Sequence, residues 1–236
     1  MTVQYPPAVS HGTIIFDLDG TLVDSAPDLA DALDTLLLEQ QLAPLGLDVA
    51  RRLIGHGITN LVRRGLELRG VALQPEDLAS HSGRFLELYS ANLSRKTRPY
   101  PGVAAALAQL HAEGWRLGVC TNKLERYARQ ILSDLDLIRY FDVVAGPDTF
   151  GVSKPDPVHL MRAVESLHGT VARSIVVGDS EVDVATAKAA GIPIVAVSYG
   201  YSRTPLPALE PELIVDDFRA VPAAINTLRS AWERVT

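Results

Sequence analysis

The stretch Phe16-Asp17-Leu18-Asp19-Gly20-Thr21 follows a short apolar run and places two carboxylates one residue apart. Side chains at positions i and i+2 of an extended chain point to the same side. Asp17 and Asp19 therefore converge if the chain stays extended, or flank a sharp turn that Gly20 permits. Two close like charges need a cation or a shared proton to coexist. The pair is a metal site, an acid/base pair, or both.

Short apolar runs rich in β-branched residues recur along the chain. Each is about four residues long, lacks polar alternation and is separated from the next by a helical pattern, which is typical of parallel strands covered on both faces. The predicted strands are Ile14–Phe16, Leu117–Cys120, Asp142–Ala145, Ile175–Val177, Ile194–Val197 and Leu213–Val215. The predicted helices between them are Val103–Ala112, Arg126–Asp134, Pro157–Leu167 and Glu181–Ala190. The sequence therefore predicts an α/β fold with a doubly wound, Rossmann-like parallel sheet.

The connection between the first two strands breaks this rhythm. From Ala26 to about Arg98 the apolar residues recur at helical spacing without a convincing strand, and such a length is too great for an ordinary loop. We expect a small α-helical cap domain, residues 25–98, inserted into a core of residues 1–24 and 99–236. Ser25 and Asp28 have the spacing of a capping box, which predicts the start of the first cap helix.

Composition limits the classes of function. The chain has 236 residues, of which 47% are hydrophobic, and a formal net charge of −6. A net negative charge gives no electrostatic reason to expect a nucleic-acid or anionic-membrane partner. A single cysteine fits a reducing compartment. We expect a cytoplasmic protein that is a monomer or homodimer.

Polar side chains follow four of the predicted strands. Because the carboxyl ends of parallel strands meet at one edge of a sheet, these distant segments should converge. A set of carboxylates with one hydroxyl and one ammonium favours Mg²⁺ and phosphate over zinc, which prefers histidine and cysteine. The residues concerned are Asp17, Asp19, Thr121, Asn122, Lys154 and Asp179.

In type and order, these residues resemble the haloacid dehalogenase-like phosphohydrolase superfamily. Its four motifs match Asp17–Thr21, Thr121 with Asn122, Lys154, and Gly178–Asp183, and the helical insert resembles the cap of its first cap class. The resemblance implies an aspartyl-phosphate mechanism with Mg²⁺ as cofactor and a small phosphorylated metabolite as substrate.

The resemblance also implies a role for each motif residue. Asp17 would attack phosphorus, and Asp19 would protonate the leaving oxygen and later activate water. Mg²⁺ would be held by the Asp17 side chain, the Asp19 backbone carbonyl and Asp179. Lys154 would offset charge during catalysis, while Thr121, Asn122 and the turn at Gly20 would bind the phosphate.

Two further residues have a functional and a structural interpretation. Asp183 could support the site, but Ser180 and Asp183 also form a capping-box pattern, and both interpretations can hold. His56 lies between two glycines in the expected cap, where it could reach the substrate or remain a solvated side chain.

Within the superfamily, the stretches Phe16–Leu29, Arg52–Gly57 and Ser198–Tyr201 are similar to those of the bacterial phosphoglycolate phosphatases. This similarity implies hydrolysis of 2-phosphoglycolate to glycolate and phosphate. The alternatives within the superfamily are a pyrophosphatase, a sugar-phosphate phosphatase and a phosphomutase of the β-phosphoglucomutase type.

Two other mechanisms are disfavoured by the sequence. Cys120 and Arg126 have the spacing used by cysteine-dependent phosphatases, but the residues between Thr121 and Glu125 include no glycine to wrap a phosphate. Cys120 is therefore expected to be a core residue. A phospho-acceptor signalling module uses similar residues, but it is about half this length and lacks a cap.

Overall fold

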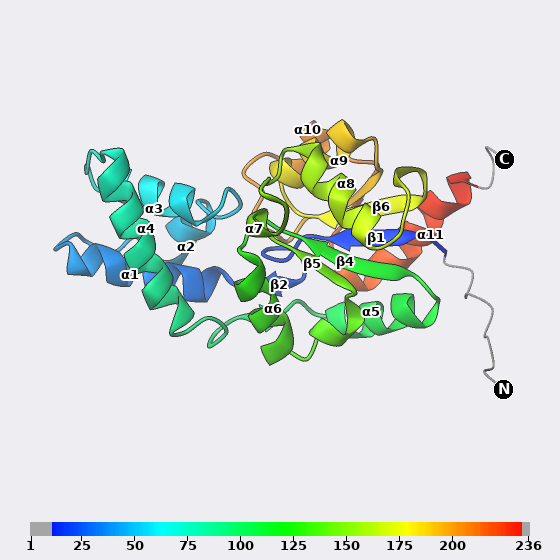
Figure 1. Ribbon diagram of the computed structural model, residues 1–236, viewed down its shortest axis with the longest axis horizontal. Coiled ribbons are helices and arrows are strands. Elements are labelled where there is room, and N and C mark those ends of the chain that lie inside the picture. The colour runs from blue at the N-terminus through cyan, green and yellow to red at the C-terminus, as the bar shows by residue number, and fades with distance from the viewer. Residues whose placement is uncertain (1–10, 233–236) are drawn as a thin grey trace.

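The computed structural model describes residues 11–232, which form a central parallel sheet with a separate group of helices beside it (Figure 1). Within these residues the sheet has six strands in the order β5-β4-β1-β6-β7-β8. The strands are β1 (Thr13–Phe16), β4 (Arg116–Cys120), β5 (Val143–Ala145), β6 (Ser174–Gly178), β7 (Ile194–Val197) and β8 (Leu213–Val215). All six predicted strands are present to within two residues at each end, and every pairing is parallel. The predicted doubly wound α/β fold is confirmed.

Helices cover both faces of the sheet. Ile14 and Phe16 of β1 belong to one hydrophobic cluster, whereas Ile15 between them belongs to a second. The first cluster is completed by α5 (Val103–Ala112), α6 (Glu125–Asp134) and α11 (Val221–Trp232), and the second by α8 (Pro157–Ser166) and α9 (Glu181–Ala190). Burial on both faces explains why the strand sequences show no polar alternation.

The remaining elements of the core are short. Two are one-turn α-helices and three are 3₁₀ turns. They are α7 (Pro147–Phe150), α10 (Leu206–Leu209), η1 (Ile138–Tyr140), η2 (Val171–Arg173) and η3 (Phe218–Ala220). Within residues 11–232, no helix combines the length and apolar character needed to cross a bilayer.

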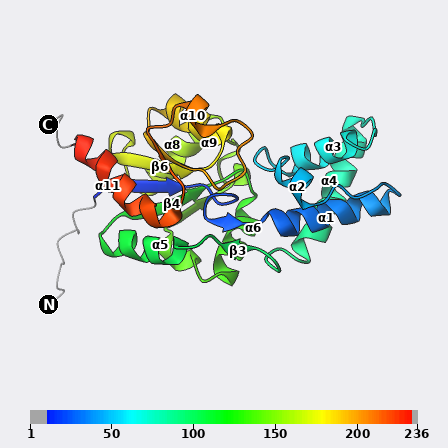
Figure 2. The ribbon, with the colours of Figure 1, turned by 180° about the vertical axis from the view of Figure 1, so that it is seen from behind.

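Four helices form a separate layer beside the sheet (Figures 1 and 2). They are α1 (Ala26–Glu39), α2 (Leu47–Arg51), α3 (Ile58–Glu67) and α4 (Pro75–Ser90). Leu33, Leu66 and Phe85 are fully buried where these helices pack together. Figure 2 shows the layer from behind, with the chain entering through α1 and leaving after α4.

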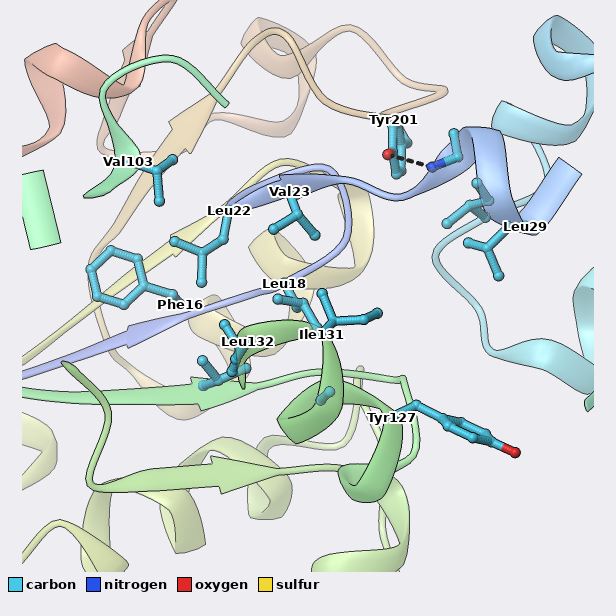
Figure 3. Packing of buried hydrophobic residues seen from close by; sticks show 14 of the residues in the cluster. Phe16, Leu18, Leu22, Val23, Leu29, Val103, Tyr127, Ile131, Leu132 and Tyr201 are labelled. Atoms are coloured by element: carbon cyan, nitrogen blue, oxygen red, sulfur yellow. Dashed lines mark hydrogen bonds between the residues drawn. The ribbon is translucent and has the colours of Figure 1, made fainter. Parts of the chain in front are cut away.

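The two linkers between this layer and the core pair with each other. The two-residue strands β2 (Val23–Asp24) and β3 (Arg98–Pro99) are antiparallel. Their pairing was not expected from the sequence, because two residues are too few to show a periodicity. Figure 3 shows the packing of Leu22 and Val23 just before α1, with a hydrogen bond from the Ala26 N–H to the Tyr201 hydroxyl. The two chain connections of the helical layer therefore lie side by side.

The predicted capping box at the start of α1 is wrong. Ser25 is the N-cap residue, but its side chain makes no capping hydrogen bond; its hydroxyl donates to Asp19 Oδ1 at 2.5 Å. Asp28 turns instead to the second linker, where its carboxylate accepts from the backbone N–H groups of Lys96 and Thr97 at 2.7–2.9 Å. Both side chains bind partners that are distant from the local helix start, so spacing alone misassigned them.

Replacement of Asp28 should loosen this attachment. Its side chain is 2% exposed, so Asp28→Ala leaves two inward-facing backbone N–H groups without an acceptor. Because unpaired buried donors cost about 1–3 kcal/mol each, we expect the free energy of unfolding in urea to fall by about 2–3 kcal/mol. The matched control is Asp31→Ala on the same helix, whose exposed ion pair with Lys96 should contribute less than about 1 kcal/mol. Equal losses in the two variants would contradict this account of the linkers.

Candidate active site

The polar residues that follow the strands meet at the carboxyl edge of the sheet, beneath the helical layer. Asp17 follows β1, Thr121 follows β4 and Asp179 follows β6. Lys154 reaches the same place from the loop after α7, and its ammonium lies 3.0 Å from Asp17 Oδ1. The convergence expected for a parallel sheet is therefore present.

Lys154 is buried between two acids. Its Nζ is 3.0 Å from Asp17 Oδ1 and 2.6 Å from Asp183 Oδ1. Burial alone would lower the pKa of Lys154, but the charges of Asp17 and Asp183 outweigh this effect and raise it. The ammonium therefore remains charged beside the Asp17 carboxylate.

Three acids are crowded at this edge. One carboxylate oxygen from each of Asp17, Asp179 and Asp183 lies within 4.8 Å of the others. Burial raises the pKa of Asp17 to about 7 against the opposing effect of Lys154, and burial together with the charges of Asp183 and Asp17 raises that of Asp179 well above its usual range. Apart from its ion pair with Lys154, the buried Asp17 Oδ1 has no hydrogen-bond partner. Crowded hard oxygens with uncompensated charge fit a divalent cation.

Asp179 is held by Thr21 and Tyr201, for which no role of their own was expected from the sequence. Its carboxylate accepts from the Thr21 hydroxyl at 2.8 Å and from the Tyr201 N–H at 2.6 Å. A Cβ at Gly20 or Gly200 would lie 2.5 or 2.3 Å from Asp179 Oδ2. The two glycines let the backbone approach Asp179 this closely. The N–H of Gly20 itself donates to the Val23 carbonyl, so it is not free for a phosphate.

Asp183 makes both the contacts expected of a helix cap and those expected of a residue that supports the site. Its Oδ2 accepts from the N–H groups of Asp179 and Ser180, and together with Ser180 it forms the capping box at the start of α9. Its Oδ1 meanwhile pairs with Lys154. The predicted helix start and the contact with the site therefore coexist in one side chain.

Asp19 faces a different set of partners. Oδ1 accepts from the Ser25 hydroxyl, and Oδ2 lies 3.1 Å from Lys123 Nζ. Sequence reasoning did not select Lys123, because nothing in its neighbourhood distinguishes it from a solvated lysine. Asp17 and Asp19 thus each have a buried lysine of their own.

Thr121 and Asn122 occupy the loop that follows β4. The Thr121 hydroxyl is buried and accepts from the Lys123 N–H. The Asn122 side chain accepts from the Lys154 N–H and donates to the carbonyls of Gly55 and Lys154. Its amide therefore ties two core loops to the helical layer, and the side chain is not open toward a phosphate.

A cavity of about 40 Å³ lies against Asp17 and Asp19. Its walls combine polar core residues with apolar residues of the helical layer: Leu29, Ile54, Ile58, Leu61 and the glycines at 55 and 57, facing Thr121, Asn122 and Lys123. His56 does not line it. The His56 ring lies instead next to the Arg203 guanidinium, with Nε2 3.8 Å from Glu181 Oε1, beside a second cavity of about 260 Å³.

Cys120 is a core residue, as expected. It is 2% exposed in the cluster beneath α8 and α9, and burial raises the pKa of its thiol to about 12. Arg126 lies over the ring of Tyr127 and donates to its hydroxyl. A thiolate nucleophile with an arginine partner is therefore absent at this position.

Comparison with known proteins agrees with this geometry. Residues 14–197 match the model of the haloacid dehalogenase-like hydrolase family. A phosphoglycolate phosphatase from Caulobacter vibrioides is 40% identical, covering 93% of both chains, and one from Rhodospirillum rubrum is 44% identical, covering 88% of both. The crystal structure of a predicted phosphoglycolate phosphatase from Haemophilus somnus superposes with a TM-score of 0.84 at 29% identity, covering 91% of this chain and 98% of the other. The chain therefore belongs to the haloacid dehalogenase-like hydrolase family.

Proposed function

We propose that this phosphatase uses Mg²⁺ and an aspartyl-phosphate intermediate to hydrolyse 2-phosphoglycolate to glycolate and phosphate. The observation that carries the proposal is the placement of Asp17 and Asp19 on one cavity with different partners. Asp17 lies in the acid cluster beside Lys154, whereas Asp19 is bound by Ser25 and Lys123. This difference in partners supports Asp17 as the nucleophile and metal ligand and Asp19 as the residue for proton transfer.

The acid cluster fits Mg²⁺ in its donor chemistry. The side chains of Asp17 and Asp179 and the backbone carbonyl of Asp19 would hold the ion, with Asp183 supporting Asp179 and Lys154. When bound, Mg²⁺ supplies positive charge that offsets the repulsion between a carboxylate and an anionic phosphate.

The chain's own residues carry the two transfer steps. An Asp17 oxygen forms a bond to phosphorus while the bond from phosphorus to the leaving oxygen breaks, and Asp19 gives its proton to that oxygen. In the second step Asp19 takes a proton from water, whose oxygen attacks phosphorus. The bond to Asp17 then breaks and phosphate is released.

Several groups near Asp17 would hold the phosphoryl oxygens. The Thr121 hydroxyl and the Lys154 ammonium lie at the same sheet edge as Asp17. Among the described residues the N–H groups of Leu18 and Asp19 make no hydrogen bond, so they are available to an anion. Together these donors would neutralise charge in the transition state.

Apolar residues of the helical layer, Leu29, Ile54, Ile58 and Leu61, line the cavity beside Asp17 and Asp19. We propose that residues 25–98 act as a cap domain that excludes water and reads the leaving group. His56, a residue of this layer whose ring lies next to the Arg203 guanidinium of the core, would then contribute to cap closure.

A panel of phosphate esters tests the substrate. With Mg²⁺ present, kcat/KM for 2-phosphoglycolate should exceed the values for glucose 1-phosphate, glucose 6-phosphate and pyrophosphate by at least about tenfold, because the relatives at 40–44% identity that cover most of the chain are phosphoglycolate phosphatases. Removal of Mg²⁺ by EDTA should abolish phosphate release. If 2-phosphoglycolate ranks among the poorest substrates, the proposed specificity is wrong. If glucose 1-phosphate is isomerised without release of phosphate, the phosphomutase alternative holds.

Asp17→Asn tests the nucleophile. An amide does not displace the leaving group, so kcat should fall by more than about 10⁴-fold while the circular dichroism spectrum stays unchanged. The matched control is Asp136→Asn, which alters an exposed carboxylate paired with Arg139 and should leave kcat within twofold. Turnover retained by Asp17→Asn would rule out the aspartyl-phosphate mechanism.

The raised pKa of Asp17 predicts a dependence of stability on pH in the metal-free protein. Folding raises this pKa to about 7 from an ordinary value of 3.8, so the folded state binds more protons and stability falls as pH rises through this window. The amide introduced by Asp17→Asn does not titrate, so comparison with this variant cancels the contributions of other groups. Relative to wild type, Asp17→Asn should gain on the order of 2 kcal/mol in free energy of unfolding between pH 5 and pH 8 with EDTA present. A constant difference between the two proteins would contradict the crowding of acids.

A further inference from the structure

Lys123 joins the proton-transfer acid to the helical layer. Its side chain is 3% exposed, and its Nζ lies 3.1 Å from Asp19 Oδ2. On the other side Nζ donates to the Tyr89 hydroxyl at 2.7 Å and lies 4.7 Å from the centre of the Tyr89 ring. One buried ammonium thus bridges the loop after β1 and helix α4.

The bridge has a fixed geometry. Burial alone would lower the pKa of Lys123, but Asp19 and Tyr89 reverse this effect and raise it, so the side chain stays charged. Tyr89 is held in turn by Phe85, whose ring centre is 5.9 Å away, and by Tyr127 at 6.0 Å. Tyr89 is part of α4 and packs against these rings, so a shift of α4 would also shift the hydroxyl that binds the Lys123 ammonium.

Each carboxylate oxygen of Asp19 has its own side-chain partner. The Ser25 hydroxyl, at the start of α1, fixes Oδ1, while Lys123 fixes Oδ2. Ser25 stands at the first linker and Tyr89 near the end of the last cap helix, so both partners depend on how the helical layer is seated. General acid catalysis requires the donor within hydrogen-bonding distance of the leaving oxygen.

We propose that Lys123 is a positioning residue, which with Tyr89 orients the Asp19 carboxylate for proton transfer when the helical layer is seated on the core. In this arrangement Lys123 would act through Asp19, whereas Lys154, beside Asp17, would contact the phosphoryl group. The inference rests on the proposed role of Asp19 in proton transfer but not on the identity of the substrate. It assigns the two buried lysines to different tasks, Lys154 to the phosphoryl group and Lys123 to proton transfer.

The test separates leaving groups that need a proton from those that do not. Alkoxide leaving groups, as in 2-phosphoglycolate and ethyl phosphate, require protonation, whereas 4-nitrophenolate departs as an anion. Lys123→Met should lower the single-turnover rate of phosphoryl transfer from both alkyl phosphates by about 100-fold. The single-turnover release of nitrophenolate from 4-nitrophenyl phosphate should stay within threefold of wild type.

Two further variants refine the expectation. Lys123→Arg keeps the positive charge and should recover at least about tenfold of the loss with the alkyl phosphates. Tyr89→Phe keeps the pair between Lys123 and Asp19 but removes the hydrogen bond to α4, so it should lose about three- to tenfold with the alkyl phosphates alone. The matched control is Lys188→Met, which alters an exposed lysine of α9 and should not change either rate.

Each contrary pattern overturns the proposal. Equal losses for alkyl and aryl phosphates in Lys123→Met would give Lys123 a purely structural role. A loss confined to 2-phosphoglycolate, with ethyl phosphate unaffected, would make Lys123 a ligand of the substrate carboxylate. If wild type hydrolyses ethyl phosphate but not 2-phosphoglycolate, the proposed substrate fails while ethyl phosphate still tests Lys123.

Discussion

The structure of the site depends on how buried carboxylates are balanced by cations. Asp17, Asp179 and Asp183 meet within a few ångströms of one another, and only Lys154 offsets their charge among the residues that the structure describes. Desolvation makes this balance strict, because an ionised carboxylate buried without a partner is far less stable than one in water. The cluster therefore fits a divalent cation, and burial, together with the charges of Asp183 and Asp19, raises the pKa of Asp17.

The parallel sheet supplies the positions at which this balance is set. The residues of β1 are buried alternately in the two hydrophobic clusters. The polar side chains of the site therefore lie beyond the strand ends. There the chain turns, and backbone groups that would be paired inside a strand become available. Tyr201 shows how loops add to this frame, since its N–H binds Asp179 while its hydroxyl binds Asp24 at the first linker. The acid cluster and the attachment of the helical layer thus share one residue.

Much of this arrangement could be predicted from sequence, and the exceptions have a common cause. Apolar runs located the strands, and motif order located Asp17, Lys154 and Asp179, because both signals are local. Ser25, Asn122 and His56 bind partners outside their own sequence motifs, and no spacing rule predicts these contacts. Lys123 could not be predicted for the same reason, because the hydroxyl that binds its ammonium belongs to Tyr89 of the helical layer.

The pairing of β2 with β3 has a consequence for the history of the fold. Because Asp24 lies opposite Arg98, the chain leaves the core and returns to it at neighbouring positions. In this respect the helical layer is a long loop with paired ends. The entropy of closing such a loop grows only slowly with its length. Residues between these two points can lengthen, shorten or be exchanged for another small domain without altering the sheet. A phosphoryl-transfer core with such an insertion point can acquire new substrates when the inserted domain is replaced by another.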